Sequence, residues 1–357
     1  MSSLILIAAG GTGGHVFPGL AVAEEIARRA PEVRIEFVGS SAPLGLERRL
    51  IPKAGLPLHL LPAFPLNTPS LVARFKGAIS LPWAMVKAFG LLVRKRPRAV
   101  LGIGGYASGP LMLVAALLRI KTMLLEPNAL PGFTNRVLKS FVDKAGCAFE
   151  VTLPVFGDRA ILTGNPVRSS FQSLPAKVHA SPMTLLCFGG SQGSRILSEG
   201  LVNALDALPT SRDLAIVHQT GPAQFEKIQA AYREKGREAT VTPFIDDMGR
   251  AFAEADILLC RAGATTIAEL TVAGKAAILV PLKGAADDHQ TFNARAMADA
   301  GAAIMIEEKD LGSLAGVLSS LAAEPARLTA MDARAKSLGR PDAATRVVDV
   351  LLEWARA

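Results

Sequence analysis

Two glycine-rich segments constrain the fold of this chain more than any other feature. "LILIAAGGTGGH" begins at Leu4, and "MTLLCFGGSQGS" begins at Met183, about half a chain later. In each segment an apolar run of strand length leads into glycines, and an amphipathic stretch of helical length follows. Glycine allows a sharp turn between a strand and a helix, so each half of the chain is predicted to contain a strand–turn–helix unit.

Further apolar runs continue this alternation in both halves. After the first turn we expect a helix from about Pro18 to Arg29 and strands at "RIEFVG", "AVLGIG" and "TMLLE". After the second turn we expect strands at "LAIVHQTG", "ATVTPFI", "DILLCRAG" and "AAILVPL". Strands that alternate with helices form parallel sheets, so the chain is predicted to be an α/β protein with two Rossmann-like, doubly wound domains in tandem.

The predicted domain boundary lies in "LTGNPVRSSF", residues 162–171, where Gly, Asn and Pro interrupt the pattern. We expect an N-terminal domain over residues 1–163 and a C-terminal domain over residues 164–340. The last residues, 341–357, are predicted to form a helix that is entered through Pro341. A chain of 357 residues is long enough for two domains, each with its own core.

The composition bears on the compartment of the protein. Half of the residues are apolar, and the mean hydropathy is +0.32. No window contains the roughly 18 uncharged apolar residues of a membrane span, and the N-terminus lacks the basic start of a secretory signal. We therefore expect a cytoplasmic protein. The three cysteines, Cys147, Cys187 and Cys260, are far apart and are predicted to be reduced thiols in buried strands.

The positive charge of the chain is concentrated in its first half. The net charge is +8, yet residues 48–125 contain twelve Lys or Arg and no Asp or Glu. Within this stretch, "SLVARFKGAISLPWAMVKAFGLLVRKRPR" mixes cations with Leu, Ile, Phe and Trp83. Such a segment suits docking to anionic lipid headgroups. A nucleic-acid-binding module and an ordinary helix with a solvated basic face are the alternatives, although no nucleic-acid-binding motif occurs.

Three glycine-rich turns are candidate phosphate sites, because a helix start offers N–H donors to an anion. They span residues 10–15, 102–110 and 189–194, and none is a Walker A motif. "GIGGYA" in the second turn matches G-x-G-x-x-A, and Glu126 ends the next strand, where a dinucleotide site would hold a ribose. An NAD-dependent oxidoreductase therefore remains an alternative, although this match lies in a third strand rather than the first.

The second half contains a denser set of motifs. "FIDDM" at residues 244–248 precedes "CRAGATTIAE", another turn rich in small residues, and "DDHQTFNA" follows. Glu269 lies in the first turns of the predicted helix, where a carboxylate can accept hydrogen bonds from the two hydroxyls of a ribose. An ordinary helix glutamate is the structural alternative.

These motifs together resemble a known family. "GGTGGHVFPGLAVAEEI", "GIGGYASGP", "GNPVR", "GGSQGS", "FIDDM" and "CRAGATTIAEL…HQTFNA", in this order, are similar to the bacterial undecaprenyldiphospho-muramoylpentapeptide β-N-acetylglucosaminyltransferases of glycosyltransferase family 28. The resemblance implies the GT-B fold, with two Rossmann-like domains separated by a cleft and a C-terminal helix that crosses back to the first domain. It also implies peptidoglycan synthesis for the cell wall, with roles in cell shape and division.

The reaction that the resemblance implies is an inverting transfer of GlcNAc. The donor is UDP-GlcNAc, and the acceptor is the C4 hydroxyl of MurNAc in lipid I, so that the products are lipid II and UDP. Another UDP-sugar transferase with a lipid acceptor is the alternative. The enzyme would lie peripherally on the cytoplasmic face of the plasma membrane, with cell-wall and division proteins as candidate partners and no nucleic acid.

The resemblance assigns the donor to the C-terminal domain. Ser191 would bind phosphate, and Gln192 and Gly193 of the same turn would bind the substrate. The backbone of Ile245 would bind uracil, and Gln290 would contact GlcNAc. Arg168 would neutralise phosphate from the linker. The diphosphate and ribose would be lined by Gly263, Ala264, Thr265, Thr266, Ile267, Ala268 and Glu269.

The N-terminal domain would hold the acceptor. The residues implied near phosphate or sugar there are Thr12, Gly13, Gly14, Gly104, Gly105, Tyr106 and Asn128. The family pattern around Asn128 is "HEQN", whereas this chain has "LEPN", so Leu125 and Pro127 replace polar residues.

His15 is the candidate general base. It lies at a predicted helix start, where the helix dipole favours a neutral ring that can accept a proton. Glu126 is the alternative base, and a histidine that caps its own helix is the structural alternative. We expect no metal ion and no cofactor, because helix N-termini and Arg168 can stabilise the leaving diphosphate; the "DD" pairs at residues 246 and 287 are expected in solvated loops.

Overall fold

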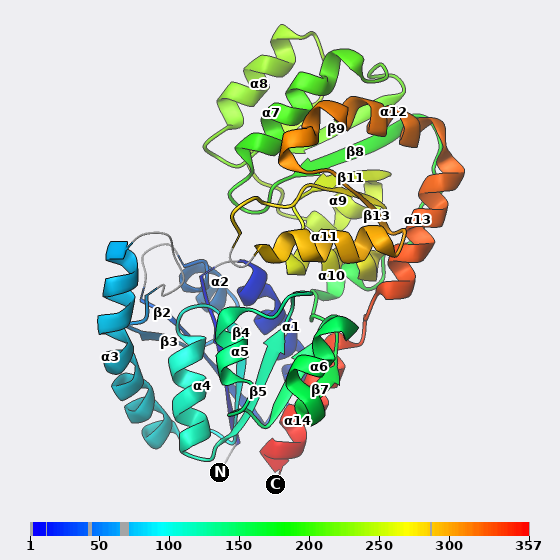
Figure 1. Ribbon diagram of the computed structural model, residues 1–357. Coiled ribbons are helices and arrows are strands. Elements are labelled where there is room, and N and C mark those ends of the chain that lie inside the picture. The colour runs from blue at the N-terminus through cyan, green and yellow to red at the C-terminus, as the bar shows by residue number, and fades with distance from the viewer. Residues whose placement is uncertain (1–2, 12, 42–44, 65–70, 286–287, 357) are drawn as a thin grey trace. The chain divides into compact units, whose positions relative to one another are not determined.

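The protein divides into two compact units. The computed structural model describes residues 3–11, 13–41, 45–64, 71–285 and 288–356. One unit comprises Met1–Arg168 and Arg340–Ala357, and the other comprises Ser169–Gly339 (Figure 1). The division at residue 168 lies within the segment "LTGNPVRSSF", five residues after the boundary expected from the sequence.

The first unit is built on a parallel sheet. In the described residues its seven strands are ordered β3-β2-β1-β4-β5-β6-β7, and every neighbouring pair is parallel. The strands are β1 (Leu4–Ala9), β2 (Arg34–Ser40), β3 (Leu58–Leu61), β4 (Ala99–Gly104), β5 (Lys121–Glu126), β6 (Lys144–Cys147) and β7 (Ala160–Leu162). The helices are α1 (Gly13–Arg29), α2 (Glu47–Lys53), α3 (Leu71–Lys95), α4 (Ser108–Leu117), α5 (Phe133–Leu138), α6 (Leu153–Phe156) and α14 (Ala343–Arg356).

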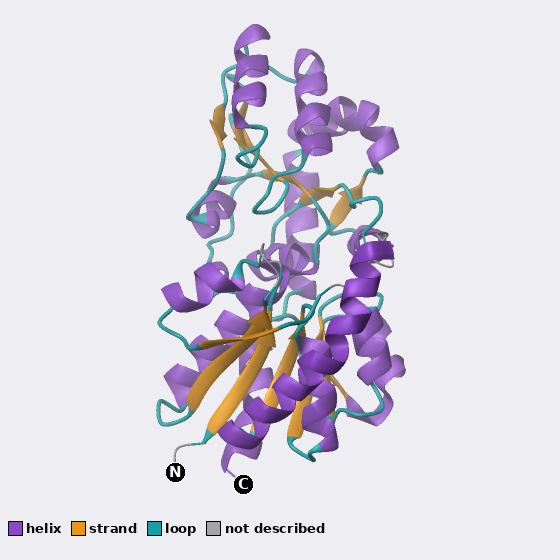
Figure 2. Cartoon of the chain, turned by 90° about the vertical axis from the view of Figure 1, so that its left-hand side faces the viewer, coloured by secondary structure: helices purple, strands orange, loops and turns teal. Residues whose placement is uncertain are grey.

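Helices cover both faces of this sheet, as Figure 2 shows. Successive residues of β1 point to opposite faces, so Leu4 and Leu6 join the apolar cluster beneath α3 and α4. Ile5 and Ile7 join the cluster beneath α1, α2 and α14. A parallel sheet buried on both faces requires such uninterrupted apolar strands, which explains the run "LILIAA".

The C-terminal helix belongs to the first unit. Val347 and Leu351 of α14 are fully buried in the same cluster as the apolar face of α1. At the surface Arg29 pairs with Asp349 at 2.7 Å, and Ser3 donates a hydrogen bond to the carbonyl of Ala355 at 2.6 Å. The last residues of the chain therefore complete the core of the unit in which the chain begins.

The second unit repeats the architecture with a six-stranded parallel sheet in the described residues, ordered β10-β9-β8-β11-β12-β13. The strands are β8 (Met183–Phe188), β9 (Leu214–Gln219), β10 (Thr240–Thr242), β11 (Ile257–Cys260), β12 (Ala277–Leu279) and β13 (Ala303–Met305). The helices are α7 (Arg195–Ala204), α8 (Phe225–Glu234), α9 (Met248–Glu254), α10 (Ala264–Ala273), α11 (His289–Asp299), α12 (Leu314–Ala323) and α13 (Pro325–Leu338).

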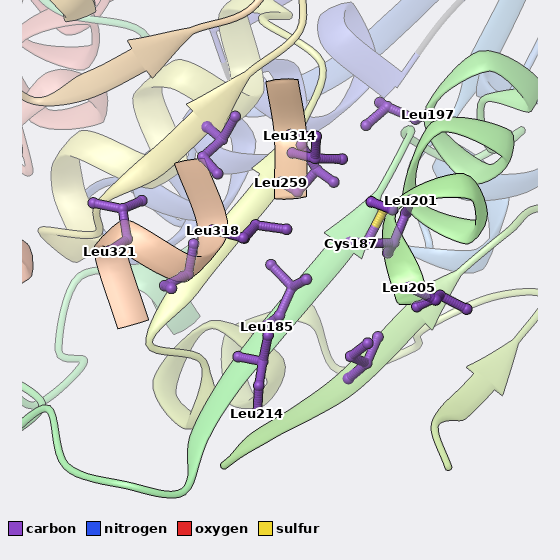
Figure 3. Packing of buried hydrophobic residues seen from close by; sticks show 14 of the residues in the cluster. Leu185, Cys187, Leu197, Leu201, Leu205, Leu214, Leu259, Leu314, Leu318 and Leu321 are labelled. Carbon is purple, nitrogen blue, oxygen red and sulfur yellow. The ribbon is translucent and has the colours of Figure 1, made fainter. Parts of the chain in front are cut away.

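A leucine-rich core joins the second sheet to its helices (Figure 3). Leu201 of α7 and Leu318 of α12 pack with Leu185 of β8, and all three side chains are fully buried. Cys187 lies in the same cluster, and all three cysteines of the chain are buried free thiols, as predicted. The two parallel sheets confirm the predicted α/β class.

The start of α1 differs from the prediction. The helix begins at Gly13, within the glycine turn, and not near Pro18. Pro18 is the sixth residue of the helix, where its ring has no N–H to donate within the helix. The proline therefore does not mark the helix start, and the helix brings its first N–H groups directly to the end of β1.

The sequence predicted that the chain does not cross a membrane. Within the described residues, none of the helices combines the length and apolar character that a bilayer crossing requires. The longest of them, α3, has 25 residues, and its sequence includes five Lys or Arg.

Candidate functional site

The first glycine turn positions His15 at the carboxyl end of β1. Gly11 adopts a positive φ of 87°, and α1 begins two residues later. His15 is half-buried, and its Nδ1 lies 3.0 Å from the carbonyl oxygen of Gly10. A carbonyl can only accept, so Nδ1 carries a proton and Nε2 is the nitrogen with the lone pair in the neutral ring. This tautomer is the one that a base acting through Nε2 requires.

The turn after β4 packs directly on this histidine. A Cβ at Gly104 would lie 2.6 Å from Cδ2 and 2.7 Å from Nε2 of His15, and a Cβ at Gly105 would lie 2.4 Å from the carbonyl oxygen of Gly10. Both glycines also have positive φ values. Only glycine fits at these two positions, and the next residue, Tyr106, is exposed. The structure thus brings together His15, Gly104 and Gly105 at adjacent strand ends.

Glu126 is enclosed by its own loop. It is 1 % exposed, and its carboxylate accepts hydrogen bonds from the backbone N–H groups of Asn128 and Gly132 and from the side-chain amide of Asn135, at 2.9 to 3.0 Å. Burial raises the pKa of this carboxyl, and the hydrogen bonds oppose that shift. The loop occupies both oxygens, so the geometry favours His15 over Glu126 as a base.

The two departures from the family pattern flank this carboxylate. Leu125 is buried in the apolar cluster beneath α1 and α14, so an apolar residue suits that position. Pro127 has no N–H to donate, and the backbone donors to Glu126 come from positions 128 and 132 instead. The loop is therefore closed without the polar residues of the pattern.

Two more of the residues predicted for the acceptor form the start of α1. Gly13 and Gly14 are the first two residues of the helix, and Thr12 lies outside the described residues. The guanidinium of Arg168 lies over the ring of Phe17, 4.6 Å from its centroid. A permanent cation is therefore present near the first turns of α1.

One residue of this region was missed by the sequence reasoning. Glu47, the first residue of α2, is completely buried and accepts hydrogen bonds from the N–H groups of Gly11, at 2.8 Å, and Ser40, at 3.3 Å. A Cβ at Gly10 or Gly39 would lie within 2.8 Å of its side chain. A glutamate at a helix start is ordinarily exposed, so no local pattern distinguishes Glu47; the only signal is that it is the last acidic residue before residues 48–125.

The second glycine turn follows β8 in the other unit. Gly190 and Gly193 have positive φ values, and a Cβ at Gly193 would lie 1.8 Å from the carbonyl oxygen of Thr220. Ser194 caps α7, because its Oγ accepts a hydrogen bond from the N–H of Leu197. Within this turn Ser191 is half-buried and Gln192 is exposed. The turn therefore presents a short polar loop at a capped helix start.

Arg261 is buried behind this turn and was also missed. It is 8 % exposed, and its Nε and Nη2 donate to the Oγ of Ser194 at 3.1 and 2.8 Å. Its Nη1 donates to the carbonyls of Val280 and Pro281 and lies 2.8 Å from a carboxylate oxygen of Glu308. The signal in the sequence was an arginine directly after the apolar strand "DILLC", at the strand end where parallel sheets bind ligands.

The segment "GATTIAE" forms the start of α10. Gly263 is the residue before the helix and has an extended backbone conformation. Glu269 is the sixth residue of the helix, and its side chain is buried. The remaining predicted residues of this segment are Ala264, Thr265, Thr266, Ile267 and Ala268, of which Ile267 is buried. Because β8 and β11 are parallel neighbours, their two turns lie at the same edge of the sheet.

Two further predicted donor residues lie in the second unit. The side chain of Gln290, on the second residue of α11, accepts a hydrogen bond from the N–H of Leu282 at 3.0 Å, next to the end of β12. Ile245 is half-buried in the loop before α9. Asp247 in the same loop caps α9 through the N–H of Arg250, which gives this carboxylate a local structural role.

Two other histidines, His218 and His59, have side-chain partners. His218 is fully buried between Tyr232 and Ser198, each at 3.1 Å, and burial lowers its pKa to about 4. His59 lies 2.6 Å from Glu36, which also pairs with Lys95. In the described part of the chain there is no group of three or more His, Cys, Asp or Glu side chains that could hold a metal ion.

Comparison with known proteins assigns both halves of the chain to the same protein family. Residues 5–147 match the model of the glycosyltransferase family 28 N-terminal domain, and residues 184–347 match that of the family's C-terminal domain. A protein of Myxococcus xanthus (strain DK1622), named UDP-N-acetylglucosamine--N-acetylmuramyl-(pentapeptide) pyrophosphoryl-undecaprenol N-acetylglucosamine transferase, is 44% identical over 98% of this chain and 92% of its own length. A protein of the same name from Syntrophus aciditrophicus (strain SB) is 41% identical over the whole of both chains.

Solved structures with a similar fold include a relative of more than 30% sequence identity. The crystal structure of Acinetobacter baumannii MurG superposes with a TM-score of 0.81 and 32% identity, covering 99% of this chain and 100% of that one. A UDP-N-acetylglucosamine 2-epimerase superposes with a TM-score of 0.68 at 13% identity, covering 100% of this chain and 98% of that one, which is a likeness of fold alone.

Proposed function

This chain belongs to glycosyltransferase family 28, and we propose that it transfers N-acetylglucosamine from UDP-GlcNAc to the MurNAc of lipid I, the undecaprenyl-linked acceptor. The products are lipid II and UDP, in peptidoglycan synthesis. The observation that carries this proposal is the 44% sequence identity, over 98% of the chain, with the Myxococcus xanthus protein that is named for this N-acetylglucosamine transfer.

The donor side of the proposal rests on the second unit. A buried guanidinium and the capped start of α7 make the turn at residues 189–194 electrostatically suited to a diphosphate. Ser191, Gln192 and Gly193 are proposed to bind phosphate, and the segment from Gly263 to Glu269 is proposed to line diphosphate and ribose. Ile245 would contact uracil, Gln290 the sugar and Arg168 the phosphate.

The acceptor side of the proposal rests on the first unit. Nε2 of His15 removes the proton from the C4 hydroxyl as that oxygen attacks the anomeric carbon of GlcNAc. The bond between the anomeric carbon and the UDP oxygen breaks, the configuration inverts, and the electron pair leaves with the diphosphate. Gly13, Gly14, Gly104, Gly105, Tyr106 and Asn128 are proposed to surround the acceptor, and helix starts stabilise the leaving group.

The membrane side of the proposal rests on α3. Its exposed apolar residues recur at helical spacing, from 46 to 63 % exposed: Ile79, Trp83, Val86, Phe89 and Val93. Lys87 lies over the ring of Trp83, 4.9 Å from its centroid, so a cation accompanies this stripe. Exposed apolar side chains accompanied by cations are typical of a helix that docks on anionic lipid headgroups, and they are unusual on an ordinary solvent-exposed helix face. The enzyme is proposed to bind peripherally at the cytoplasmic face of the membrane, without nucleic acid, where cell-division proteins could be recruited.

A transfer assay tests the reaction directly. Labelled UDP-GlcNAc is incubated with a lipid I analogue, and lipid II and UDP are quantified, with binding of NAD(H) measured in parallel. We expect stoichiometric lipid II and UDP and no NAD(H) binding. NAD(H) binding without transfer would replace the proposal with the oxidoreductase alternative, and transfer to a different lipid acceptor alone would assign another UDP-sugar transferase.

Co-sedimentation tests the membrane surface. Vesicles with and without anionic lipid are compared with duplex DNA at equal salt. Binding to anionic vesicles alone supports the proposal, whereas binding to DNA alone, or to neither, contradicts it. Trp83→Ser should weaken vesicle binding, and Trp354→Ser in α14 is the matched control.

A further inference from the structure

The peptide group between Gly10 and Gly11 connects His15 to the buried carboxylate of Glu47. Its carbonyl oxygen lies 3.0 Å from Nδ1 of His15, and its N–H donates to Oε2 of Glu47 at 2.8 Å. The two groups of one trans peptide point in opposite directions, so the peptide is a rigid bridge between the imidazole and the carboxylate.

We propose that Glu47 is a positioning residue for the base, acting on His15 through this single peptide group. The inference rests on the proposed function, because it takes His15 as the group that accepts the proton. A carboxylate that accepts the N–H polarises the peptide and makes its carbonyl a stronger acceptor for the Nδ1 proton. Glu47 thereby fixes the tautomer of His15 and stabilises the imidazolium that forms when Nε2 takes a proton from the acceptor hydroxyl.

The surroundings of Glu47 are built for a carboxylate. The side chain is completely buried, and among the described residues no cation forms an ion pair with it. Oε1 accepts the N–H of Ser40, and a Cβ at Gly10 or Gly39 would overlap the side chain. A buried charge held by backbone N–H groups is costly unless the site is preformed, which the glycines here provide.

The start of α2 also contacts the carbonyl of Gly11, which belongs to the peptide group after the bridge. The N–H of Leu46 donates to the carbonyl of Gly11 at 3.3 Å, so residues 46 and 47 contact both the N–H and the C=O of Gly11. This carboxylate also occupies the N–H of Gly11, which a phosphate would otherwise use. The first turn is therefore arranged around a proton acceptor, and its Gly11 amide does not serve an anionic ligand.

The described groups around the first turn of α1 come from three other segments of the chain. The guanidinium of Arg168 lies over the ring of Phe17 in the next turn of α1. The turn after β4 contributes only glycine backbone against the ring, followed by the exposed phenol of Tyr106. Glu126 is enclosed by its own loop. Glu47 is therefore the carboxylate whose hydrogen bonds connect it to His15.

The decisive variant is Glu47→Gln, which can still accept the N–H of Gly11 but carries no charge. The titration of His15 is followed by NMR of the ring carbon-bound proton, with the signal assigned from His15→Gln. We expect the midpoint to fall by about one pH unit, as a unit charge at this range predicts. In the transfer assay kcat should fall about tenfold, the acid limb of the pH profile should move to lower pH, and donor KM should stay unchanged.

The matched control is Glu36→Gln, a second buried carboxylate of the same unit that pairs with His59 and Lys95 instead. It should leave the His15 titration unmoved, even where the unfolding temperature falls. A His15 midpoint that is the same in the wild-type protein and in Glu47→Gln overturns the proposal. Wild-type protein that titrates as expected but makes no lipid II would instead overturn the proposed function.

A second measurement needs no change at Glu47. In the wild-type protein, protonation of His15 should move the amide proton of Gly11 downfield, with the same midpoint as the ring, because the shared peptide becomes more polarised. A Gly11 amide that does not follow the titration contradicts the bridge, whether or not Glu47→Gln folds. Glu47→Asp, which keeps the charge, should retain more of the His15 midpoint than Glu47→Gln does.

Discussion

The two glycine turns share a local structure but have opposite charges buried behind them. The first turn is held by the carboxylate of Glu47, which is completely buried, and the second by the guanidinium of Arg261, which is 8 % exposed. Each is a strand, a glycine turn and a helix start, and the backbone alone would make both of them anion sites. The buried charge distinguishes the two turns. We propose that the cation favours a diphosphate at the second turn and that the anion favours a proton-accepting histidine at the first.

The largest expected effect comes from removing the proposed base of the first turn. His15→Ala should lower kcat about a thousandfold, within the usual range for a general base, and leave UDP affinity unchanged. Transfer rate and UDP binding are measured separately. His59→Gln is the matched control, because it changes a structural histidine of the same unit and should keep kcat. Turnover that survives in His15→Ala would remove the chemical role of the first turn.

The next effect comes from removing the cation behind the second turn. Arg261→Met should weaken UDP binding about a hundredfold, because Ser194 loses the guanidinium that donates to its Oγ. The free energy of unfolding should fall by about 3 kcal/mol, because the carboxylate of Glu308 loses its ion-pair partner. Calorimetric UDP titration and denaturant unfolding measure the two losses. Arg195→Met, an exposed arginine of α7, is the control and should change neither. UDP affinity that is the same in Arg261→Met and the wild type would contradict the contrast between the turns.

A smaller effect should follow from crowding the histidine. Gly104→Ala places a methyl group 2.6 Å from the ring of His15 at a positive φ, so the ring must move. We expect kcat to fall about tenfold with UDP binding retained, as misplacement of a catalytic group does. Gly90→Ala in α3 meets no atom within 4 Å and is the control. Equal kcat in both variants would show that the position of His15 does not matter.

The smallest effect concerns acid stability of the second unit. The pKa of His218 is lowered to about 4 by burial, so the unfolded chain takes up a proton below about pH 6.5 while the folded chain stays neutral until about pH 4. Stability should therefore fall by about 2 kcal/mol between pH 7 and pH 5 from this group. Unfolding curves of the wild type and His218→Gln, each at both pH values, measure the difference. A pH dependence that the substitution leaves unchanged would assign the acid sensitivity elsewhere.

Much of the fold follows from the apolar pattern. Runs such as "LILIAA" and "MTLLCF" lie in sheets buried on both faces, so their composition alone predicts parallel strands, and the glycines mark their carboxyl ends. The start of α1 was not predicted, because a proline inside a helix is indistinguishable in sequence from a proline at its first turn. Cys147, Cys187 and Cys260 were correctly predicted as buried thiols, because they are far apart in the sequence and lie in apolar runs of strand length.

The polar residues behind the turns could not be predicted. Glu47 lies 36 residues from its partner Gly11, and Arg261 lies 67 residues from Ser194. Such pairs depend on which strands become neighbours in the sheet, and that order is not written in any short motif. Glu126 shows the opposite case, since its partners are within nine residues, yet its enclosure depends on how the loop folds back. Local patterns therefore identify the turns but not the charges that give each its chemistry.

The most direct test of the contrast is an amide NMR titration of the full chain with UDP. The amides of Ser191 and Gln192 in the second turn should shift progressively and saturate, while the amide of Gly11 in the first turn, already bonded to Glu47, should not move. This result would support a diphosphate site at the turn backed by Arg261. A saturating shift at Gly11 with none at Ser191 and Gln192 would contradict the account.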